Sequence, residues 1–129
     1  MRINRFLEQS CLCRVSRLYR GVEQDVAAQL APYSVNLIQG LVLAAIYFDD
    51  AATVRPSALS EAFGIGKPQV SQVISHLESM QYVRRVVDPK DARSYRLKVR
   101  AENRRKIQAI INHIERADKR AERAWKELG

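Results

Sequence analysis

Residues 84–100 read RRVVDPKDARSYRLKVR, and this stretch decides the fold. Residues 82–87 and 94–99 predict two short strands, and in the second Tyr95, Leu97 and Val99 alternate with basic residues. The residues between them, Asp-Pro and Asp-Ala-Arg, are types that favour tight turns. The stretch therefore predicts an antiparallel hairpin whose second strand has one apolar face and one basic face.

Positive charge is concentrated around this hairpin. Residues 81–106 hold ten Lys and Arg against three Asp and Glu, a net charge of +7 within a chain of 129 residues whose total is +8. Clustered basic charge is the electrostatic pattern of a protein that binds polyanions. A uniformly basic surface would be the simpler alternative, but the clustering favours nucleic acid as the partner.

Two helices joined by a short turn are predicted just before the hairpin. Residues 56–63 predict a short helix, and residues 67–80 predict a longer one with Pro68 in its first turn, where a missing N–H costs no hydrogen bond. Residues 64–66, Gly-Ile-Gly, form the turn between them. A short helix, a glycine turn and a longer helix are the pattern of a helix-turn-helix.

The region before these helices is also mostly helical by pattern. Residues 6–30 carry apolar side chains at three- and four-residue steps, which predicts one continuous helix. Residues 35–48 are apolar on most sides and predict a buried central helix with Ser34 as its N-cap. Residues 53–55 predict a short strand.

The last helix is predicted over residues 101–128, with Ile, Ala and Trp along one side. At 1.5 Å per residue it spans roughly 40 Å, about the full width of a domain of this size. We therefore expect much of this stripe to meet a second subunit. The alternative is that the two terminal helices pack only on each other and on the core.

Together these elements predict one domain, mainly α with a small β-hairpin. A winged helix-turn-helix lobe at residues 34–100 is expected to bind DNA, and residues 1–33 and 101–129 are expected to form dimerisation helices. Dimers supply the two-fold symmetry that DNA-binding proteins match to palindromic half-sites.

The DNA contacts are expected from the start of the second helix and from the hairpin. In a helix-turn-helix the N-terminal residues of the second helix enter the major groove, where Gln can pair with adenine and Lys can reach guanine or a phosphate. Arg93, near the hairpin tip, can enter the minor groove with Asp88 or Asp91 as its brace. The candidate contact residues are Lys67, Pro68, Gln69, Ser71, Gln72, His76, Arg84, Lys90, Arg93 and Arg96. The simpler interpretation is a solvated helix face and a solvated loop.

The two cysteines and two histidines do not predict a metal site. Cys11 and Cys13 are expected in one helix on opposite faces, and His76 and His113 are not at ligand spacing. Cys11 shares the apolar stripe and is expected to be buried, whereas Cys13 is the candidate redox-sensitive thiol because its basic neighbours favour the thiolate. No nucleophile–base pair, paired carboxylates or phosphate loop is present, so we expect neither an enzyme nor a cofactor.

No apolar run approaches the roughly 18 residues of a membrane span, and the N-terminus lacks the apolar region of a secretory signal. We therefore expect a cytoplasmic protein with no membrane partner.

From about residue 31 to residue 107 the chain resembles the MarR family of bacterial and archaeal transcriptional regulators. The family's wing signature, Asp-x-x-Asp-x-Arg, matches residues 88–93; its Leu-Ser/Ala-Glu-x-Phe/Leu-Gly helix matches residues 59–64; and its recognition-helix pattern matches residues 69–78. The resemblance implies a homodimer that binds a pseudo-palindromic operator in double-stranded DNA, usually as a repressor, and is often relieved by a small ligand or by oxidation.

Two features depart from the family pattern. Gln81 stands where family members usually have Gly, so it must adopt the left-handed conformation at a cost of about 1 kcal/mol unless the helix ends differently. The Leu-Thr-x-x-Gly that usually opens the last helix is replaced by Val-Arg-Ala-Glu-Asn at residues 99–103, without the Thr cap.

The resemblance also implies an effector pocket between the terminal helices and the DNA-binding lobe. Its candidate lining is aromatic: Tyr19, Tyr33, Tyr47 and Phe48. The alternative is that these rings fill the core. A competing hypothesis for the whole protein is a winged-helix interaction or assembly module whose basic hairpin contacts an acidic protein.

Overall fold

A computed structural model describes residues 2–49 and 53–128 of the chain. In chain order its elements are α1 (Arg2–Gln9), α2 (Cys11–Leu30), the 3₁₀ turn η1 (Ala31–Tyr33), α3 (Leu37–Tyr47), α4 (Pro56–Phe63), α5 (Lys67–Ser79), β1 (Val83–Asp88), β2 (Asp91–Val99), the 3₁₀ turn η2 (Ala101–Asn103) and α6 (Arg104–Leu128). The predicted class, mainly helical with a two-stranded hairpin, is confirmed.

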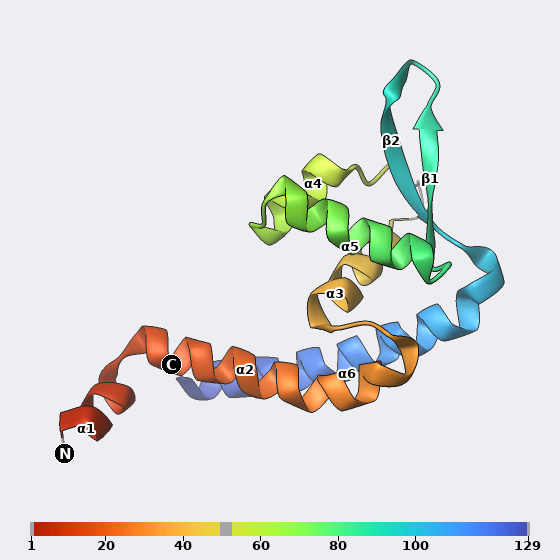
Figure 1. The fold of residues 1–129 in the computed structure, drawn as a ribbon. Helices are drawn as coiled ribbons and strands as arrows, with labels where there is room; N and C mark the ends of the chain where they lie inside the picture. Colours follow the sequence, from red (N-terminus) through yellow and green to blue (C-terminus); the bar gives the residue numbers. More distant parts are fainter. Residues whose placement is uncertain (1, 50–52, 129) are drawn as a thin grey trace.

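The elements form two parts joined by a central helix (Figure 1). The long helices α2 and α6 lie side by side and antiparallel, α1 projects beyond them, and both termini lie at that end. On the other side of α3, helices α4 and α5 lie beside the upright β1–β2 hairpin, called the wing below. The helix-turn-helix and the wing therefore stand apart from the paired terminal helices.

The core runs through both parts. Leu30 of α2, Leu43 of α3 and Ile110 of α6 are completely buried, as are Ile74 of α5 and Leu97 of β2. Burying one such side chain contributes about 1.5–3 kcal/mol. Because α3 supplies core residues toward both sides, it joins the terminal helices to the DNA-facing elements.

A glycine sets how closely α3 approaches α6. A Cβ added at Gly40 would lie 2.9 Å from Ile114 Cδ1 on α6, closer than side-chain carbons pack. Gly40 is itself buried. The missing side chain therefore lets the two helices meet at this point.

The strands of the wing pair as expected. They are antiparallel, with Val83 opposite Val99, Arg85 opposite Leu97 and Val87 opposite Tyr95, and the register shifts between Val87 and Asp88 at the turn. Val83 and Leu97 are buried against the helices. The apolar face predicted for the second strand thus fixes the base of the wing to the core.

The first helix differs from its prediction as one continuous helix over residues 6–30. It breaks at Ser10, whose backbone is extended (φ −75°, ψ 115°) and whose Oγ accepts a hydrogen bond from the Cys13 N–H at 3.2 Å. Ser10 is therefore the N-cap of α2, and α1 is a separate helix.

The N-cap of the central helix was also assigned to the wrong residue. Asn36 caps α3 in a capping box, accepting from the Gln39 N–H while the Gln39 side chain accepts from the Asn36 N–H, both at 2.9 Å. Ser34 instead ends η1 in the left-handed conformation, with φ 59°.

The strand predicted at residues 53–55 is not formed. This segment makes a single ladder-like contact, from the Leu97 N–H to the Val54 carbonyl at 2.9 Å, and Arg55 is already the N-cap of α4. The sheet of the described residues therefore has only the two wing strands.

Gln81 adopts the left-handed conformation that the sequence requires, with φ 62°. The Tyr82 N–H bonds the Leu77 carbonyl at 3.0 Å, which closes the end of α5 as glycine does elsewhere. The Asn103 side chain donates to the Gln81 carbonyl at 2.7 Å and holds this turn against η2. The last helix, predicted from residue 101, begins as η2 and becomes α-helical at Arg104.

Within residues 2–49 and 53–128, no single helix is both long and apolar enough to cross a membrane, although α2 and α3 pass that test as a pair bent by 70°. The same residues contain no cluster of three or more His, Cys, Asp or Glu that could hold a metal ion.

Candidate nucleic-acid interface

The turn between α4 and α5 is built by glycine and by a serine clamp. Gly64 ends α4 in the left-handed conformation (φ 62°), which costs a glycine no Cβ clash. The Ser60 hydroxyl donates to the Ile65 carbonyl at 2.5 Å, and the Ile65 N–H returns to the Ser60 carbonyl at 3.2 Å. These contacts fix the angle at which α5 leaves the turn.

Helix α5 presents a polar face from its first turn. Val70, Val73, Ile74 and Leu77 are buried. The exposed positions near its N-terminus are Lys67, Pro68, Gln69, Ser71 and Gln72. Because the buried stripe holds the helix, these side chains are free to reach a ligand.

His76 differs from the other α5 candidates. It is half-buried near the C-terminal end of the helix, and its Nε2 lies 2.5 Å from the Ser34 carbonyl. This contact ties α5 to the segment before α3. The structure therefore places His76 with the internal contacts and not with the five exposed N-terminal residues.

The tip of the wing carries an almost fully exposed cation. The Arg93 side chain is 96% exposed, and its Nε lies 3.8 Å from Asp91 Oδ1. Asp91 Oδ1 also accepts from the Arg93 N–H at 3.0 Å, so this carboxylate shapes the turn from which Arg93 projects. Of the two acids expected to brace Arg93, Asp91 does so weakly and Asp88 does not.

Asp88 instead pairs with Arg55 in front of α4. Arg55 Nη2 donates to Asp88 Oδ2 at 2.9 Å, and Asp88 Oδ1 accepts from the Lys90 N–H at 2.9 Å. The backbone N–H of Lys90 and then the Arg55 guanidinium hold the pKa of Asp88 below its usual value. Sequence patterns do not reveal this pair because its members lie 33 residues apart.

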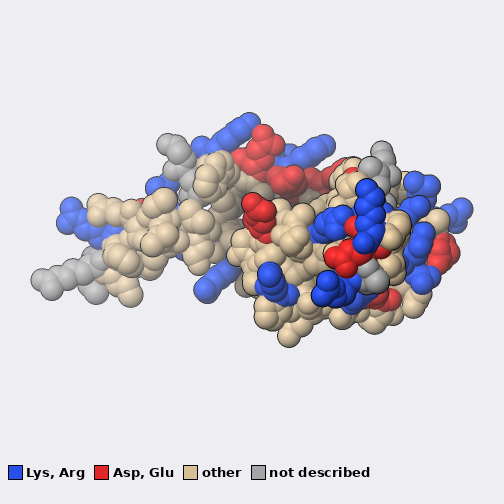
Figure 2. All heavy atoms as spheres, turned by 90° about the horizontal axis from the view of Figure 1, so that it is seen from above, with Lys and Arg blue, Asp and Glu red and all other residues tan. Residues whose placement is uncertain are grey.

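The remaining wing candidates differ in exposure. Arg84 and Lys90 are exposed, whereas Arg96 is half-buried and its Nε is enclosed without a hydrogen-bond partner. Seen from the side toward which the wing projects, Lys and Arg gather on and around it, with a few acidic side chains among them (Figure 2).

A hollow of about 320 Å³ lies between the wing and the starts of α4 and α5. It is lined by Arg55, Pro56, Ser57, Lys67, Val70, Ser71, Arg93, Ser94 and Tyr95. Three cations and three hydroxyl-bearing serines face the space, and helix N-termini attract anions. The arrangement suits a phosphate group.

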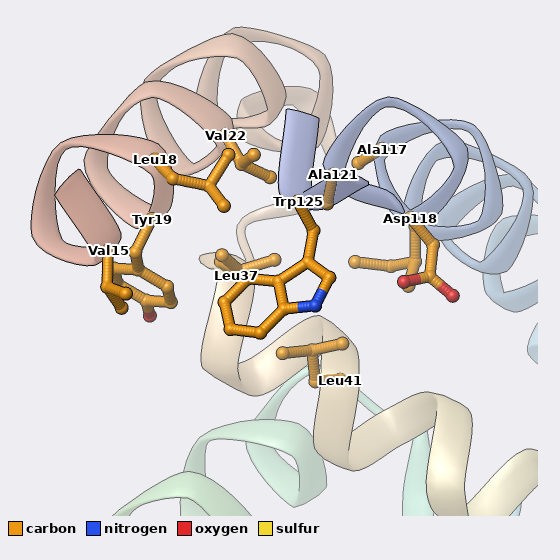
Figure 3. A pocket seen from close by; sticks show the side chains of 11 residues that line it. Val15, Leu18, Tyr19, Val22, Leu37, Leu41, Ala117, Asp118, Ala121 and Trp125 are labelled. Atoms are coloured by element: carbon orange, nitrogen blue, oxygen red, sulfur yellow. The ribbon is translucent and has the colours of Figure 1, made fainter. Parts of the chain in front are cut away.

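A second cavity, of about 290 Å³, is apolar and lies among α2, α3 and α6. Figure 3 shows the Trp125 ring in its centre, with Leu37 and Leu41 from α3 on one side and Leu18 and Val22 from α2 above. Tyr19 lines its edge, where burial and then Glu23 raise the pKa of the phenol.

The four aromatic residues predicted to line one pocket do not meet. Only Tyr19 reaches the apolar cavity. Tyr33 packs on His113 with ring centroids 6.0 Å apart, and Tyr47 and Phe48 stack edge-to-face beside a different, more polar hollow. The prediction was wrong because it took aromatic residues from separate helix faces. The apolar stripe of the last helix, including Trp125, was the better sequence signal for the position of the apolar cavity.

The terminal helices expose large apolar side chains. Leu12 is 83% exposed and Trp125 is 60% exposed. Ile3, Phe6, Val15 and Tyr19 are exposed as well. These six residues come from α1, α2 and α6, so the surface is uncovered along that whole end of the molecule.

The structure corrects the prediction made for Cys11. Cys11, expected in the core, is exposed, and Cys13 is half-buried. The error follows from the apolar stripe of α2, which is exposed at Leu12 and Val15 as it is at Cys11.

The helix-turn-helix followed by a basic hairpin defines the chain as a winged-helix protein. The MarR family model matches residues 33–94. A MarR transcriptional regulator from Methanosarcina mazei is 25% identical over 81% of this chain and 74% of its own, with a TM-score of 0.71. Residues 33–94 thus match the MarR family of winged helix-turn-helix proteins, whose members are DNA-binding transcriptional regulators and not enzymes.

Two further solved structures share the fold. S. aureus MepR in complex with DNA is 16% identical over 85% of this chain and 80% of its own, with a TM-score of 0.78. CouR from Rhodococcus jostii, bound to p-coumaroyl-CoA, is 23% identical over 88% of this chain and 79% of its own, with a TM-score of 0.75. No curated protein matches the chain.

Proposed function

We propose that this protein is a homodimeric repressor that binds a pseudo-palindromic operator in double-stranded DNA. Residues 34–100 form its DNA-binding lobe, and residues 1–33 and 101–129 form its dimerisation region. The observation that carries the proposal is that the exposed polar start of α5 and the 96% exposed Arg93 border one cationic hollow. MepR, which shares the fold, was solved on DNA.

Within the DNA-binding lobe, we assign different tasks to the helix and the wing. Gln69 and Gln72 read base edges in the major groove, and Lys67 reaches a phosphate or guanine. Arg93 enters the minor groove, and Lys90 and Arg84 lie near the backbone. His76 takes no part in base reading because its ring is held by the Ser34 carbonyl.

The dimer is proposed from the exposed apolar residues of α1, α2 and α6. Six large apolar side chains on one end of a small domain are more than scattered surface residues. A second copy of the chain would cover them, and the two-fold axis would place two α5 helices on successive turns of the duplex, about 34 Å apart.

Relief of repression by a small ligand is proposed through the apolar cavity around Trp125. Its lining is apolar apart from the Asp118 carboxylate, the Tyr19 hydroxyl and the Trp125 indole N–H, which suits a hydrophobic or aromatic molecule. CouR was solved with an aromatic acyl-CoA bound. A ligand here would touch α2, α3 and α6 together, and α3 also packs against α5.

Selection of bound duplexes from a random pool tests the proposal. We expect a consensus with two inverted half-sites centred about one helical turn apart. A pool without enrichment, combined with binding to an acidic protein surface, would favour the competing hypothesis of an interaction or assembly module.

A further inference from the structure

The pair formed by Arg55 and Asp88 lies between the helix-turn-helix and the outer half of the wing. Its nitrogen–oxygen distance is 2.9 Å, and the Asp88 side chain is only 14% exposed while that of Arg55 is 45% exposed. Asp88 is the last residue of β1 and Arg55 is the N-cap of α4. The contact therefore joins two elements that differ in sequence position and in their expected role on DNA.

Both ends of the pair are fixed by backbone contacts. The Arg55 carbonyl accepts from the N–H groups of Ala58 and Leu59 at 3.0 and 3.3 Å, which anchors it to the first turn of α4. The other carboxylate oxygen of Asp88, Oδ1, accepts from the Lys90 N–H at 2.9 Å, which anchors the Asp88 side chain to the wing turn. A rigid helix start is thus connected to a rigid turn through two charged side chains.

A second set of contacts holds the base of the wing. Arg85 Nε donates to Glu78 Oε1 on α5 at 2.9 Å, and the Arg85 guanidinium lies 4.4 Å from the centre of the Tyr95 ring. These contacts hold the base of the hairpin against α5. They lie farther from the turn that carries Arg93 than the Arg55–Asp88 pair does. Only the Arg55–Asp88 pair, among the ion pairs of the described residues, connects the turn end of β1 to the helix-turn-helix.

We infer that Arg55 is a positioning residue that sets the angle of the wing, and so the place of Arg93, through its ion pair with Asp88. This inference rests on the proposed DNA-binding function. A single, partly exposed ion pair of this kind adds little to folding stability. Its effect is to restrict the orientation of the hairpin relative to α5. That orientation matters because the tip must meet the minor groove while α5 occupies the major groove.

A direct phosphate contact by Arg55 is the competing role, because Arg55 also lines the cationic hollow. Asp88 separates the two roles by the sign of its effect. Removing a carboxylate near DNA strengthens binding if only charge matters. If the pair positions the wing, removing that carboxylate weakens binding.

The test compares Asp88→Asn, Arg55→Ala and the double variant on the duplex selected from the random pool. Asparagine can still accept from the Lys90 N–H, so the turn survives, and what is lost is the negative charge that faces Arg55 and, more weakly, Arg96. We expect each single variant to bind about three- to tenfold more weakly, and the double variant no more weakly than the worse single one, because both act through one contact. The exchanged pair, Arg55→Asp with Asp88→Arg, should recover part of the affinity, because arginine at position 88 restores the ion pair but cannot accept from the Lys90 N–H.

Glu61→Gln is the matched control, since it removes one exposed carboxylate from α4 that makes no ion pair in the structure. Its affinity should equal or slightly exceed that of the unaltered protein. Tighter binding by Asp88→Asn, or additive losses in the double variant, would overturn the inference and leave Arg55 as a phosphate ligand.

A measurement without DNA keeps this inference separate from the proposed function. The Leu97 N–H donates to the carbonyl of Val54, the residue before Arg55. Exchange of this N–H therefore reports on the contact between β2 and the segment before α4. Hydrogen exchange at Leu97 should accelerate severalfold in Arg55→Ala and Asp88→Asn but not in Glu61→Gln, while exchange at the buried Ile110 stays unchanged. Unchanged exchange at Leu97 would contradict the positioning role even if no duplex were found for the unaltered protein.

Discussion

The two parts of the molecule differ in how far a single chain completes them. The helix-turn-helix and wing hold one another through internal contacts, including the Ser60 clamp, the Arg85–Glu78 pair and the Arg55–Asp88 pair. The terminal helices instead leave Leu12 and Trp125 exposed beside an open apolar cavity. A helix-turn-helix and wing that hold one another are thus attached to terminal helices with an uncovered apolar surface, and this contrast supports the proposed dimer.

The largest effect should come from placing a charge on the uncovered end. Trp125→Asp should abolish the dimer and weaken binding to a two-half-site duplex at least about 100-fold, because one half-site alone supplies only part of the contacts. The fold of the single chain should survive, since Trp125 is already 60% exposed. Sedimentation measures the oligomeric state, and fluorescence anisotropy of a labelled duplex measures the DNA affinity.

Val87→Asp is the control for this change because Val87 is equally exposed but lies on the wing. It should remain dimeric. A monomeric unaltered protein at micromolar concentration, or a dimeric Trp125→Asp, would mean that the terminal helices are not the interface.

The contact between α3 and α6 should be sensitive to the side-chain volume at position 40. Gly40→Val would push into Ile114 of α6 and destabilise the chain by about 1–3 kcal/mol, the usual cost of overpacking. Gly21→Ala on α2 meets no atom within 4 Å and should stabilise the helix by up to about 1 kcal/mol. Chemical unfolding of both variants measures the contrast, and equal stabilities would show that α3 does not press on α6.

A smaller effect on stability is expected when the pH is lowered, because the terminal helix α6 carries a histidine that resists protonation. Burial and then the charge of Arg116 lower the pKa of His113, whose Nδ1 lies 3.0 Å from Arg116 and 3.1 Å from Gln29. Below the ordinary histidine value near 6.5, the unfolded chain binds a proton that the folded chain refuses, so stability falls as pH falls. His113→Gln should flatten this dependence between about pH 7 and 5. An unchanged slope would exclude His113 as its source.

The smallest effect should come from the cysteines. If Cys13 senses oxidants, as its basic neighbours suggest, peroxide should lower the DNA affinity of the unaltered protein and of Cys11→Ser but not of Cys13→Ser. Cys11 is the matched control because it is exposed on the same helix. Equal responses of the three proteins would remove the redox hypothesis.

The same contrast explains what the sequence could predict. The helix-turn-helix and wing follow from local signals, such as Pro68 at a helix start, Gly64 at a turn and alternation in β2, and even the unusual Gln81 conformation was foreseen. Local signals suffice there because each element is short and has its own start and stop residues.

The terminal helices were harder because periodicity does not show where a helix is interrupted or covered. The apolar spacing continues through Ser10, so the break appears only in its capping contact. Gln39, three residues after Asn36, could have identified the correct cap of α3. The exposure of Cys11 and the separation of the four aromatic residues depend on packing between distant elements, which spacing alone does not encode.

The central claim, that the start of α5 reads bases while the wing positions the protein, is tested most directly by affinity against salt for three proteins on a specific and a random duplex. Arg93→Ala should weaken binding to both duplexes and reduce the salt slope by about one unit per lost phosphate contact. Gln69→Ala should leave the slope unchanged and lose roughly 1–3 kcal/mol of discrimination. If Arg93→Ala binds both duplexes as the unaltered protein does, the hairpin is not a DNA-contacting wing, and the proposed division between base reading by α5 and positioning by the wing is wrong.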